Sequence, residues 1–174
     1  YTDPSFVPEG VSLIPLGSRK AFGSWKRANE IVQVCNSTAA VSVFGDDGVP
    51  NPDDMVQGAV GNCWFCSALS VLALRPALVK DIFVTPGPLP LTGSGSDSSR
   101  TAAAPSAVTS LRTSEESAGL YCVRFFKNGT WTAVCVDDFF PTRRNGQWLM
   151  GHTRGSQLWV SLLEKAYASL HGSY

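Results

Sequence analysis

The sequence predicts an α+β fold, and three patterns support this prediction. Residues 120–127 and 130–140 are rich in aromatic and β-branched residues and flank Asn128-Gly129, a dipeptide typical of a type I′ hairpin turn. Residues 156–172 have apolar side chains at helical spacing. A third pattern predicts a helix that begins at Cys63. An antiparallel hairpin combined with separate helices is typical of the α+β class.

The N-terminal third of the chain shows little regular pattern. Residues 1–56 contain many Pro, Gly and Asp residues and only short apolar runs, so we expect irregular structure with one helical turn within 25–33.

The first clear helix follows this irregular region. We expect Asn62 to be its N-cap and Leu74 to lie near its end, because Pro76 disfavours helix in the residue before it. Pro76 suits the first turn of a second short helix, which we expect to end near Phe83.

Residues 85–118 are dominated by Ser, Thr, Ala, Gly and Pro and contain no aromatic residue. Such a segment cannot bury enough apolar surface to offset the entropy of ordering it. We interpret it as a flexible insertion within one domain that spans residues 1–174, and a linker between two domains is the alternative.

The C-terminal segment predicts an amphipathic helix. Gly172 is placed to end this helix in a left-handed conformation. The apolar face consists of Trp159 and the apolar residues three, four, seven, eight and eleven positions after it: Leu162, Leu163, Ala166, Tyr167 and Leu170.

The composition excludes several classes of protein. The sequence has 14 basic and 14 acidic residues, which gives no support for nucleic-acid binding. No stretch approaches the roughly 18 consecutive apolar residues of a transmembrane helix, and the N-terminus lacks a signal-peptide pattern. The odd number of cysteines, five, favours reduced thiols in a cytoplasmic protein over a secreted disulfide framework.

Cys63 lies where a helix favours a thiolate, because the first turn presents free N–H groups and the positive end of the helix dipole. Gly58 and Gly61 allow a tight turn and a close approach of substrate to the backbone. The side-chain amide of Gln57 and the backbone N–H of Cys63 could together form an oxyanion hole. The alternative is that Cys63 is a small buried hydrophobic residue at a helix start.

Cys63 and Cys66 also form a C-x-x-C pattern. A thioredoxin-like redox pair would follow a βαβ pattern, but a loop precedes this one. A zinc knuckle would need a second matched pair, whereas Cys122 and Cys135 lie in the two hairpin strands. Both readings are disfavoured, and Cys66 is interpreted as a core position one turn along the helix.

Several segments, taken in order, resemble the calpain family of cysteine proteases. QGAVGNCW is similar to the family signature Gln-Gly-x-x-Gly-Asp-Cys-Trp around its nucleophile. The opening segment has Val7 as an extra residue before its proline, and Ala28 replaces the usual proline of a second block. The other matching blocks are YTDPSFVP, WKRANEI, WTAVCVDDFFP and LWVSLLEKAYASLHGSY; only residues 85–118 are foreign to the family pattern.

The resemblance implies the first subdomain of a papain-like protease core, with a central Cys-bearing helix, a second long helix and a short antiparallel sheet. Cys63 would be the nucleophile and Gln57 the oxyanion donor, while Gly61 and Trp64 would shape the substrate cleft; for Trp64, simple core packing is the alternative. The family's catalytic His and Asn belong to a second subdomain.

Neither histidine of this chain matches the catalytic position. His152 lies where the family has a non-catalytic histidine, and His171 lies at a helix C-terminus, where it complements the dipole. We therefore expect the isolated chain to have no meaningful peptidase activity.

Two departures from the family pattern have consequences. Asn62 replaces the usual Asp, which should slightly ease thiolate formation.

The family binds Ca²⁺ through backbone carbonyls, an acid before the Gln and a Glu in a second segment. Asp54 matches the first acid, with Asp46, Asp47 and Asp53 near it. Arg154 and Gln157 stand where acids are expected in the second segment, so an intact calcium site is doubtful.

Asp137 and Asp138 could be read as a catalytic acid pair, but their place in the family motif suggests a structural role. We expect them to bind nearby backbone or Arg143 and Arg144.

Two hypotheses for function follow. The first is the Cys-bearing half of a cytoplasmic calpain-like endopeptidase that cleaves proteins and needs a subdomain carrying His and Asn. The second is a non-catalytic calpain-like module that binds proteins or regulates assembly.

Overall fold

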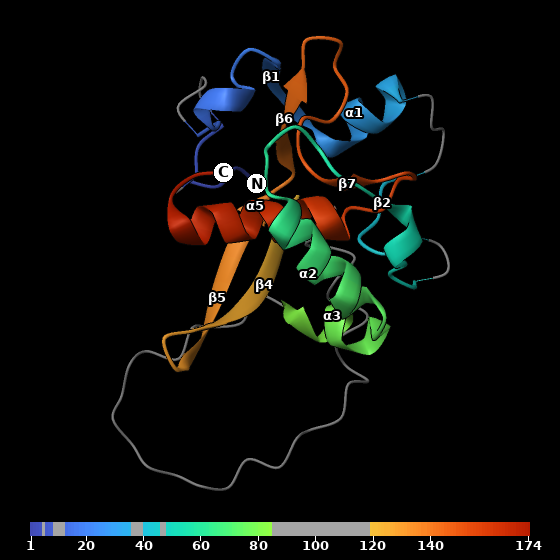
Figure 1. Ribbon diagram of the computed structural model, residues 1–174, viewed down its shortest axis with the longest axis vertical. Coiled ribbons are helices and arrows are strands. Elements are labelled where there is room, and N and C mark those ends of the chain that lie inside the picture. The colour runs from blue at the N-terminus through green and yellow to red at the C-terminus, as the bar shows by residue number, and fades with distance from the viewer. Residues whose placement is uncertain (5, 9–12, 36–39, 46–47, 85–118) are drawn as a thin grey trace, which may run out of the picture.

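The computed structural model describes residues 1–4, 6–8, 13–35, 40–45, 48–84 and 119–174, and it confirms the α+β class (Figure 1). The predicted insertion at 85–118 lies outside the described residues. In chain order the elements are η1 (Leu16–Ser18), β1 (Phe22–Arg27), α1 (Ala28–Val34), η2 (Pro52–Asp54), β2 (Met55–Val56), α2 (Cys63–Ala73), α3 (Pro76–Ile82), β3 (Phe83–Val84), β4 (Leu120–Lys127), β5 (Thr130–Asp137), β6 (Phe139–Arg143), β7 (His152–Thr153) and α5 (Trp159–His171).

The predicted hairpin is confirmed as β4 and β5, which pair antiparallel along their whole length from Leu120↔Asp137 to Lys127↔Thr130. Asn128 and Gly129 both have positive φ, 52° and 81°, as a type I′ turn requires. β3 adds a third strand beside β4.

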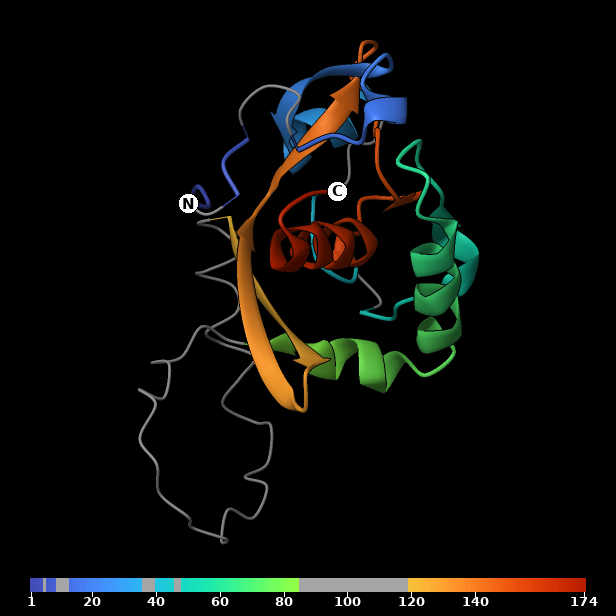
Figure 2. The ribbon, with the colours of Figure 1, turned by 60° about the vertical axis from the view of Figure 1, so that its left-hand side comes forward.

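The second predicted strand, 130–140, is in fact two strands. The ladder with β4 stops at Asp137, whose carboxylate accepts the N–H of Phe139 at 3.0 Å. This local bond turns the backbone, and β6 then pairs with β1 in a separate sheet, so the chain from β5 to β6 crosses the whole molecule (Figure 2).

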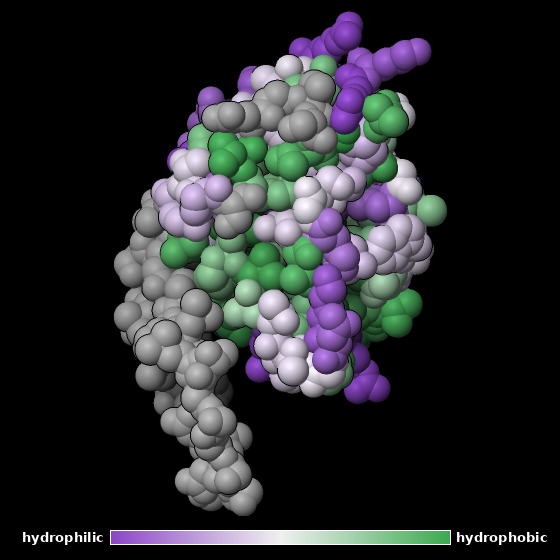
Figure 3. All heavy atoms as spheres, turned by 90° about the vertical axis from the view of Figure 1, so that its left-hand side faces the viewer, coloured by the Kyte–Doolittle hydropathy of each residue, from purple (hydrophilic) through white to green (hydrophobic). Residues whose placement is uncertain are grey.

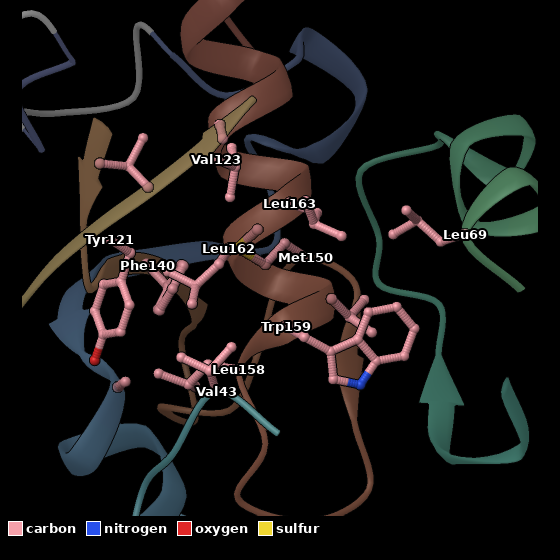
Figure 4. Packing of buried hydrophobic residues seen from close by; sticks show 14 of the residues in the cluster. Val43, Leu69, Tyr121, Val123, Phe140, Met150, Leu158, Trp159, Leu162 and Leu163 are labelled. Carbon is pink, nitrogen blue, oxygen red and sulfur yellow. The ribbon is translucent and has the colours of Figure 1, made fainter. Parts of the chain in front are cut away.

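The helix α5 lies at the centre of the fold, with β4 and β5 on one side and α2 on the other (Figures 1 and 2). It begins at Trp159, three residues later than the predicted segment, and Gly172 ends it with φ 91° as expected. Packing against it comes from several elements, including Leu69 of α2, Val123 of β4 and Phe140 of β6 (Figure 4). Because neighbours surround the helix, Ser161, Glu164 and Lys165 are buried together with most of the predicted apolar face, of which Tyr167 and Leu170 are only partly buried.

The expectation of irregular structure in residues 1–56 is wrong in part. β1 and α1 form there, and α1 is two turns long, with Glu30 accepting the N–H of Arg27 at 2.8 Å in a capping box. Within the described residues β1 pairs with β6 alone, a strand far along the chain, and no local pattern predicts such a pairing.

The two predicted helices after Cys63 are confirmed, with Pro76 in the first turn of α3. Asn62 occupies the N-cap position of α2, but its side chain makes no capping hydrogen bond, which corrects the expectation. Among the described residues, no single helix is long and apolar enough to cross a membrane, although α2 and α3 together, bent by 116°, satisfy length and composition.

The expectation that all five cysteines are reduced is wrong for one pair. Cys122 and Cys135 lie directly opposite each other in the β4–β5 ladder and form a disulfide, with their Cα atoms 4.0 Å apart. Cys35, Cys63 and Cys66 are free. The cysteine count therefore no longer argues for a reducing compartment.

Some large apolar side chains remain at the surface. Trp64 is 58% exposed, and Phe126 and Trp131 are similarly exposed near the tip of the hairpin. Hydrophobic side chains also gather near the middle of the face shown in Figure 3.

Candidate active site

Cys63 is the first residue of α2 and is exposed to solvent. Gln57 directly follows β2 and is also exposed, so the predicted nucleophile and oxyanion donor stand at the two ends of one turn. Gly61, within that turn, has φ 79°, a conformation that favours glycine. The alternative in which Cys63 is a buried hydrophobic residue does not hold.

The turn from Gln57 to Cys63 is fixed by backbone contacts with two distant segments. The N–H of Ala59 donates to the carbonyl of Leu149 at 2.7 Å, and the hydroxyl of Ser18 donates to the carbonyl of Ala59 at 2.5 Å. A Cβ atom at Gly58 would lie 2.2 Å from the carbonyl carbon of Met150. Gly58 is therefore required because two backbones approach closely.

A cavity of about 470 Å³ lies beside Cys63. Asn62 and Trp64, which flank Cys63, line it together with Tyr167 and Glu164 of α5. The exposure of Trp64 fits a cleft role, while its ring contacts with Phe65 and Tyr167, with centroids 5.6 and 5.5 Å apart, fit packing. The cleft roles of Gly61 and Trp64 stay predictions.

Cys66 is half-buried, one helical turn after Cys63. Burial, followed by the nearby charges of Glu164 and Cys63, raises the pKa of its thiol to about 11. A thiol with a raised pKa is a poor nucleophile, which supports the reading of Cys66 as a packing residue. The zinc alternative fails because Cys122 and Cys135 are joined to each other.

Glu164 is a site residue that the sequence patterns did not indicate. Its carboxylate is 3% exposed; one oxygen, Oε2, accepts the N–H of Gly151 at 2.8 Å, and Oε1 is buried without a hydrogen-bond partner. Burial raises the pKa of this carboxyl to about 7, although the N–H of Gly151 and the nearby side-chain amide of Asn62 partly oppose the shift. No periodicity could reveal it, because Glu164 lies off the predicted apolar face and is covered only in the tertiary structure.

Asp137 and Asp138 have structural roles, as predicted, and Asp137 accepts the nearby backbone N–H of Phe139, but their charged partners are not the expected arginines. Asp137 is fully buried, forms an ion pair with Lys165 and accepts the N–H of Asp3 at 2.6 Å. Asp138 pairs with Arg27. The expected partners Arg143 and Arg144 form neither ion pair, because β6 leads them away from the two acids.

Both histidines bind backbone carbonyls. Nδ1 of His152 lies 3.0 Å from the carbonyl of Met150, and the ring stacks on Trp148; burial lowers its pKa. Nδ1 of His171 lies 2.8 Å from the carbonyl of Tyr167 at the end of α5.

The structure brings together the two segments that match the family's calcium-binding positions, around Asp54 and Arg154. β2 pairs with β7 through Met55↔Thr153, and the carbonyl of Asp54 accepts the N–H of Arg154 at 2.8 Å. Within the described ranges, no three His, Cys, Asp or Glu side chains are grouped to hold a metal ion, and Asp46 and Asp47 lie outside those ranges. The expectation that the calcium site is not intact stays a prediction.

The chain is similar to known proteins over its whole length. A family model described as "Calpain family cysteine protease" matches residues 1–174. The relatives include "Calpain-type cysteine protease DEK1" of Arabidopsis thaliana at 32% identity, "Calpain-type cysteine protease ADL1" of Oryza sativa subsp. japonica at 33%, and "Calpain-2 catalytic subunit" of Bos taurus at 32%. Each alignment covers 100% of this chain, but only 7% of the two plant proteins and 21% of the bovine protein.

Proposed function

The chain belongs to the calpain family of cysteine proteases, and from this premise we propose that it forms the nucleophile-bearing part of an endopeptidase that cleaves proteins. The observation that supports this most directly is the exposed Cys63 at the first turn of α2, at one end of a turn that carries Gln57 at the other. Ser18, Leu149 and Met150 hold this turn, so the thiol is presented by fixed backbone.

In the proposed mechanism the Cys63 thiolate bonds to the carbon of the scissile carbonyl, and the displaced electron pair moves to the oxygen. The amide of Gln57 and the N–H of Cys63 stabilise that oxyanion. The C–N bond then breaks, and the departing amine takes a proton from a histidine. Water hydrolyses the resulting thioester, which releases the new carboxylic acid and restores the thiol.

The histidine and its orienting Asn would come from a second subdomain. In both histidines of this chain, Nδ1 lies at a backbone carbonyl, and neither histidine occupies the family's catalytic position. This supports the need for a second subdomain that carries the catalytic histidine. The chain covers a small share of its relatives, so this partner and the protein substrates are inferred from family membership.

The test is cleavage of an unstructured protein substrate by the full-length protein. We expect Cys63→Ala to abolish it, by roughly a thousandfold or more. Gln57→Ala should lower kcat by roughly a hundredfold or more, as loss of an oxyanion donor does. Residues 1–174 alone should not turn over substrate. Full activity in Cys63→Ala would refute the proposal.

The non-catalytic module is the second candidate. Arg154 stands where an acid is expected, and its backbone N–H occupies the carbonyl of Asp54; both features weaken a calcium site and so favour this candidate. The two candidates differ in the chemistry of Cys63. An epoxide or iodoacetamide should label Cys63 selectively in the full-length enzyme, whereas a binding module would show no labelling beyond that of an ordinary exposed thiol such as Cys35.

A further inference from the structure

A second cavity, of about 440 Å³, lies between β1 and the loop that follows β6. It shares no lining residue with the cavity beside Cys63. Three of its lining side chains are cations, and none is an acid: Lys26 comes from β1, Arg143 ends β6, and Arg144 follows it. The rest of the lining is small or polar, including Ser24, Asn145 and Gly146.

The loop after β6 has a fixed shape. The N–H of Arg143 donates to the carbonyl of Gln147, and the N–H of Gly146 donates to the carbonyl of Arg143, both at 2.8 Å. Gly146 has φ 80°, and a Cβ atom there would lie 3.3 Å from Nζ of Lys26. The missing side chain therefore lets the Lys26 ammonium lie against the loop that carries both arginines.

The arginine at the end of β6 is held in place. Nε of Arg143 donates to the carbonyl of Trp148 at 3.1 Å, which uses one N–H of its guanidinium and orients the others. The side chain of Asn145 is bonded to Gln147 on both its amide atoms, and its second amide hydrogen remains available.

The nearby acids are engaged elsewhere. Glu30 caps α1 through the N–H of Arg27, and Asp138 pairs with the Arg27 side chain. Across the part of the chain that the structure describes, the two ion pairs are Arg27–Asp138 and Asp137–Lys165, so Lys26, Arg143 and Arg144 have no acidic partner there.

Three like charges around one recess repel each other, and a bound anion would remove that cost. Arginine forks bind the oxygens of phosphate in pairs, and lysine adds a compact charge. A phosphoryl group presents several charged oxygens at once, which suits three cations around one recess better than a single carboxylate does.

We propose that this recess, lined by Lys26, Arg143 and Arg144, binds the phosphoryl group of a phosphate ester. The site is separate from the cavity beside Cys63, so the proposal is independent of peptidase activity. The lining residues are all polar, charged or glycine, which favours a soluble ester over a lipid headgroup.

The test is a titration of the chain with inorganic phosphate, and then with glycerol phosphate, at constant ionic strength, followed by NMR chemical shifts or by calorimetry. We expect saturable binding with shifts at Ser24, Lys26 and residues 143–146. Arg144→Gln and Lys26→Gln should each weaken binding roughly tenfold, the usual effect of losing a charge-assisted hydrogen bond. Lys20→Gln and Arg75→Gln, which remove exposed cations outside the recess, are the matched controls.

Two results would overturn the proposal: a response to phosphate no larger than that to chloride, or equal losses in the recess variants and the controls. A further arm uses vesicles of phosphatidylcholine with and without a phosphoinositide. Binding to the phosphoinositide vesicles with no response to soluble phosphate would refute the soluble ester and assign the recess to a lipid headgroup.

Discussion

Glu164 accepts a hydrogen bond from the backbone N–H of Gly151 at 2.8 Å, while its other carboxylate oxygen is buried without a partner. The same glycine is bound from its other side, because the hydroxyl of Ser161 donates to its carbonyl at 2.9 Å. Gly151 directly follows Leu149 and Met150, the residues that contact the turn before Cys63. A buried charged side chain on the central helix thus supports the backbone behind the candidate nucleophile.

The first prediction concerns the cost of this buried carboxyl. Its folded pKa, about 7, is above its ordinary value of 4.5, so the folded state binds the proton more tightly than the unfolded state. Ionising the buried carboxyl lowers the free energy of unfolding. This loss is absent below pH 4.5, grows as pH rises to 7 and is constant above pH 7, at on the order of 3 kcal/mol. We expect Glu164→Gln to gain stability over wild type across this window, measured by urea unfolding at several pH values. A stability difference that does not change with pH would contradict this.

The second prediction concerns the position before the nucleophile. Asn62→Asp restores the family residue and adds a carboxylate beside Cys63 and near Glu164, with which Asn62 shares the cavity lining. A negative charge near sulfur disfavours the thiolate, so iodoacetamide should label Cys63 roughly two- to fivefold more slowly at pH 8. Labelling of Cys35, followed by peptide mass spectrometry in the same sample, is the internal control. An unchanged or faster rate at Cys63 would show that the charge does not reach the thiol.

The third prediction concerns the buried pair of Lys165 and Asp137. Burial lowers the pKa of Lys165, while the adjacent Asp137 charge opposes this shift. Lys165→Met leaves Asp137 as an unpaired buried charge, and we expect a loss of about 3–5 kcal/mol in the free energy of unfolding. The double variant Lys165→Met/Asp137→Leu removes both charges and should recover part of that loss. If Lys165→Met and Asp137→Leu each lower the free energy of unfolding by less than about 1 kcal/mol, the buried pair does not stabilise the fold as predicted.

The fourth prediction concerns calcium. Because Arg154 stands where an acid is expected, and its backbone N–H already occupies the carbonyl of Asp54, we expect isothermal titration of the chain to show no Ca²⁺ binding below millimolar concentration. The variant Arg154→Glu/Gln157→Glu replaces both departures with acids and should bind more tightly. Sub-millimolar binding by the unaltered chain would contradict the expectation.

The fifth prediction counts thiols. Alkylation of the chain unfolded in denaturant without reductant should modify Cys35, Cys63 and Cys66 only, since Cys122 and Cys135 are joined. Reduction before alkylation should add two modified residues, as read by intact mass. Modification of all five cysteines without reductant would show that the pair is open.

The sequence predicted the elements whose signals are local. Asn128-Gly129 indicated the hairpin because its turn type needs two positive φ angles, and Pro76 indicated where one helix ends and the next begins. The two-residue turn also sets the register that places Cys122 opposite Cys135, a consequence that could have been drawn from the spacing alone.

The sequence by itself thus determined the class of fold and the place of Cys63 at a helix start, because each depends on residues close together in the chain, and several ordered segments indicated the family. The exposure of Cys63, which the sequence left open, was decided by the tertiary structure. The tertiary structure alone decided which charges are buried and with which partners. Lys165 meets Asp137, and Glu164 meets Gly151, only after β6 and α5 pack at the centre. Their desolvation is a property of that packing, and so no pattern in the chain predicted the charged network behind the candidate site.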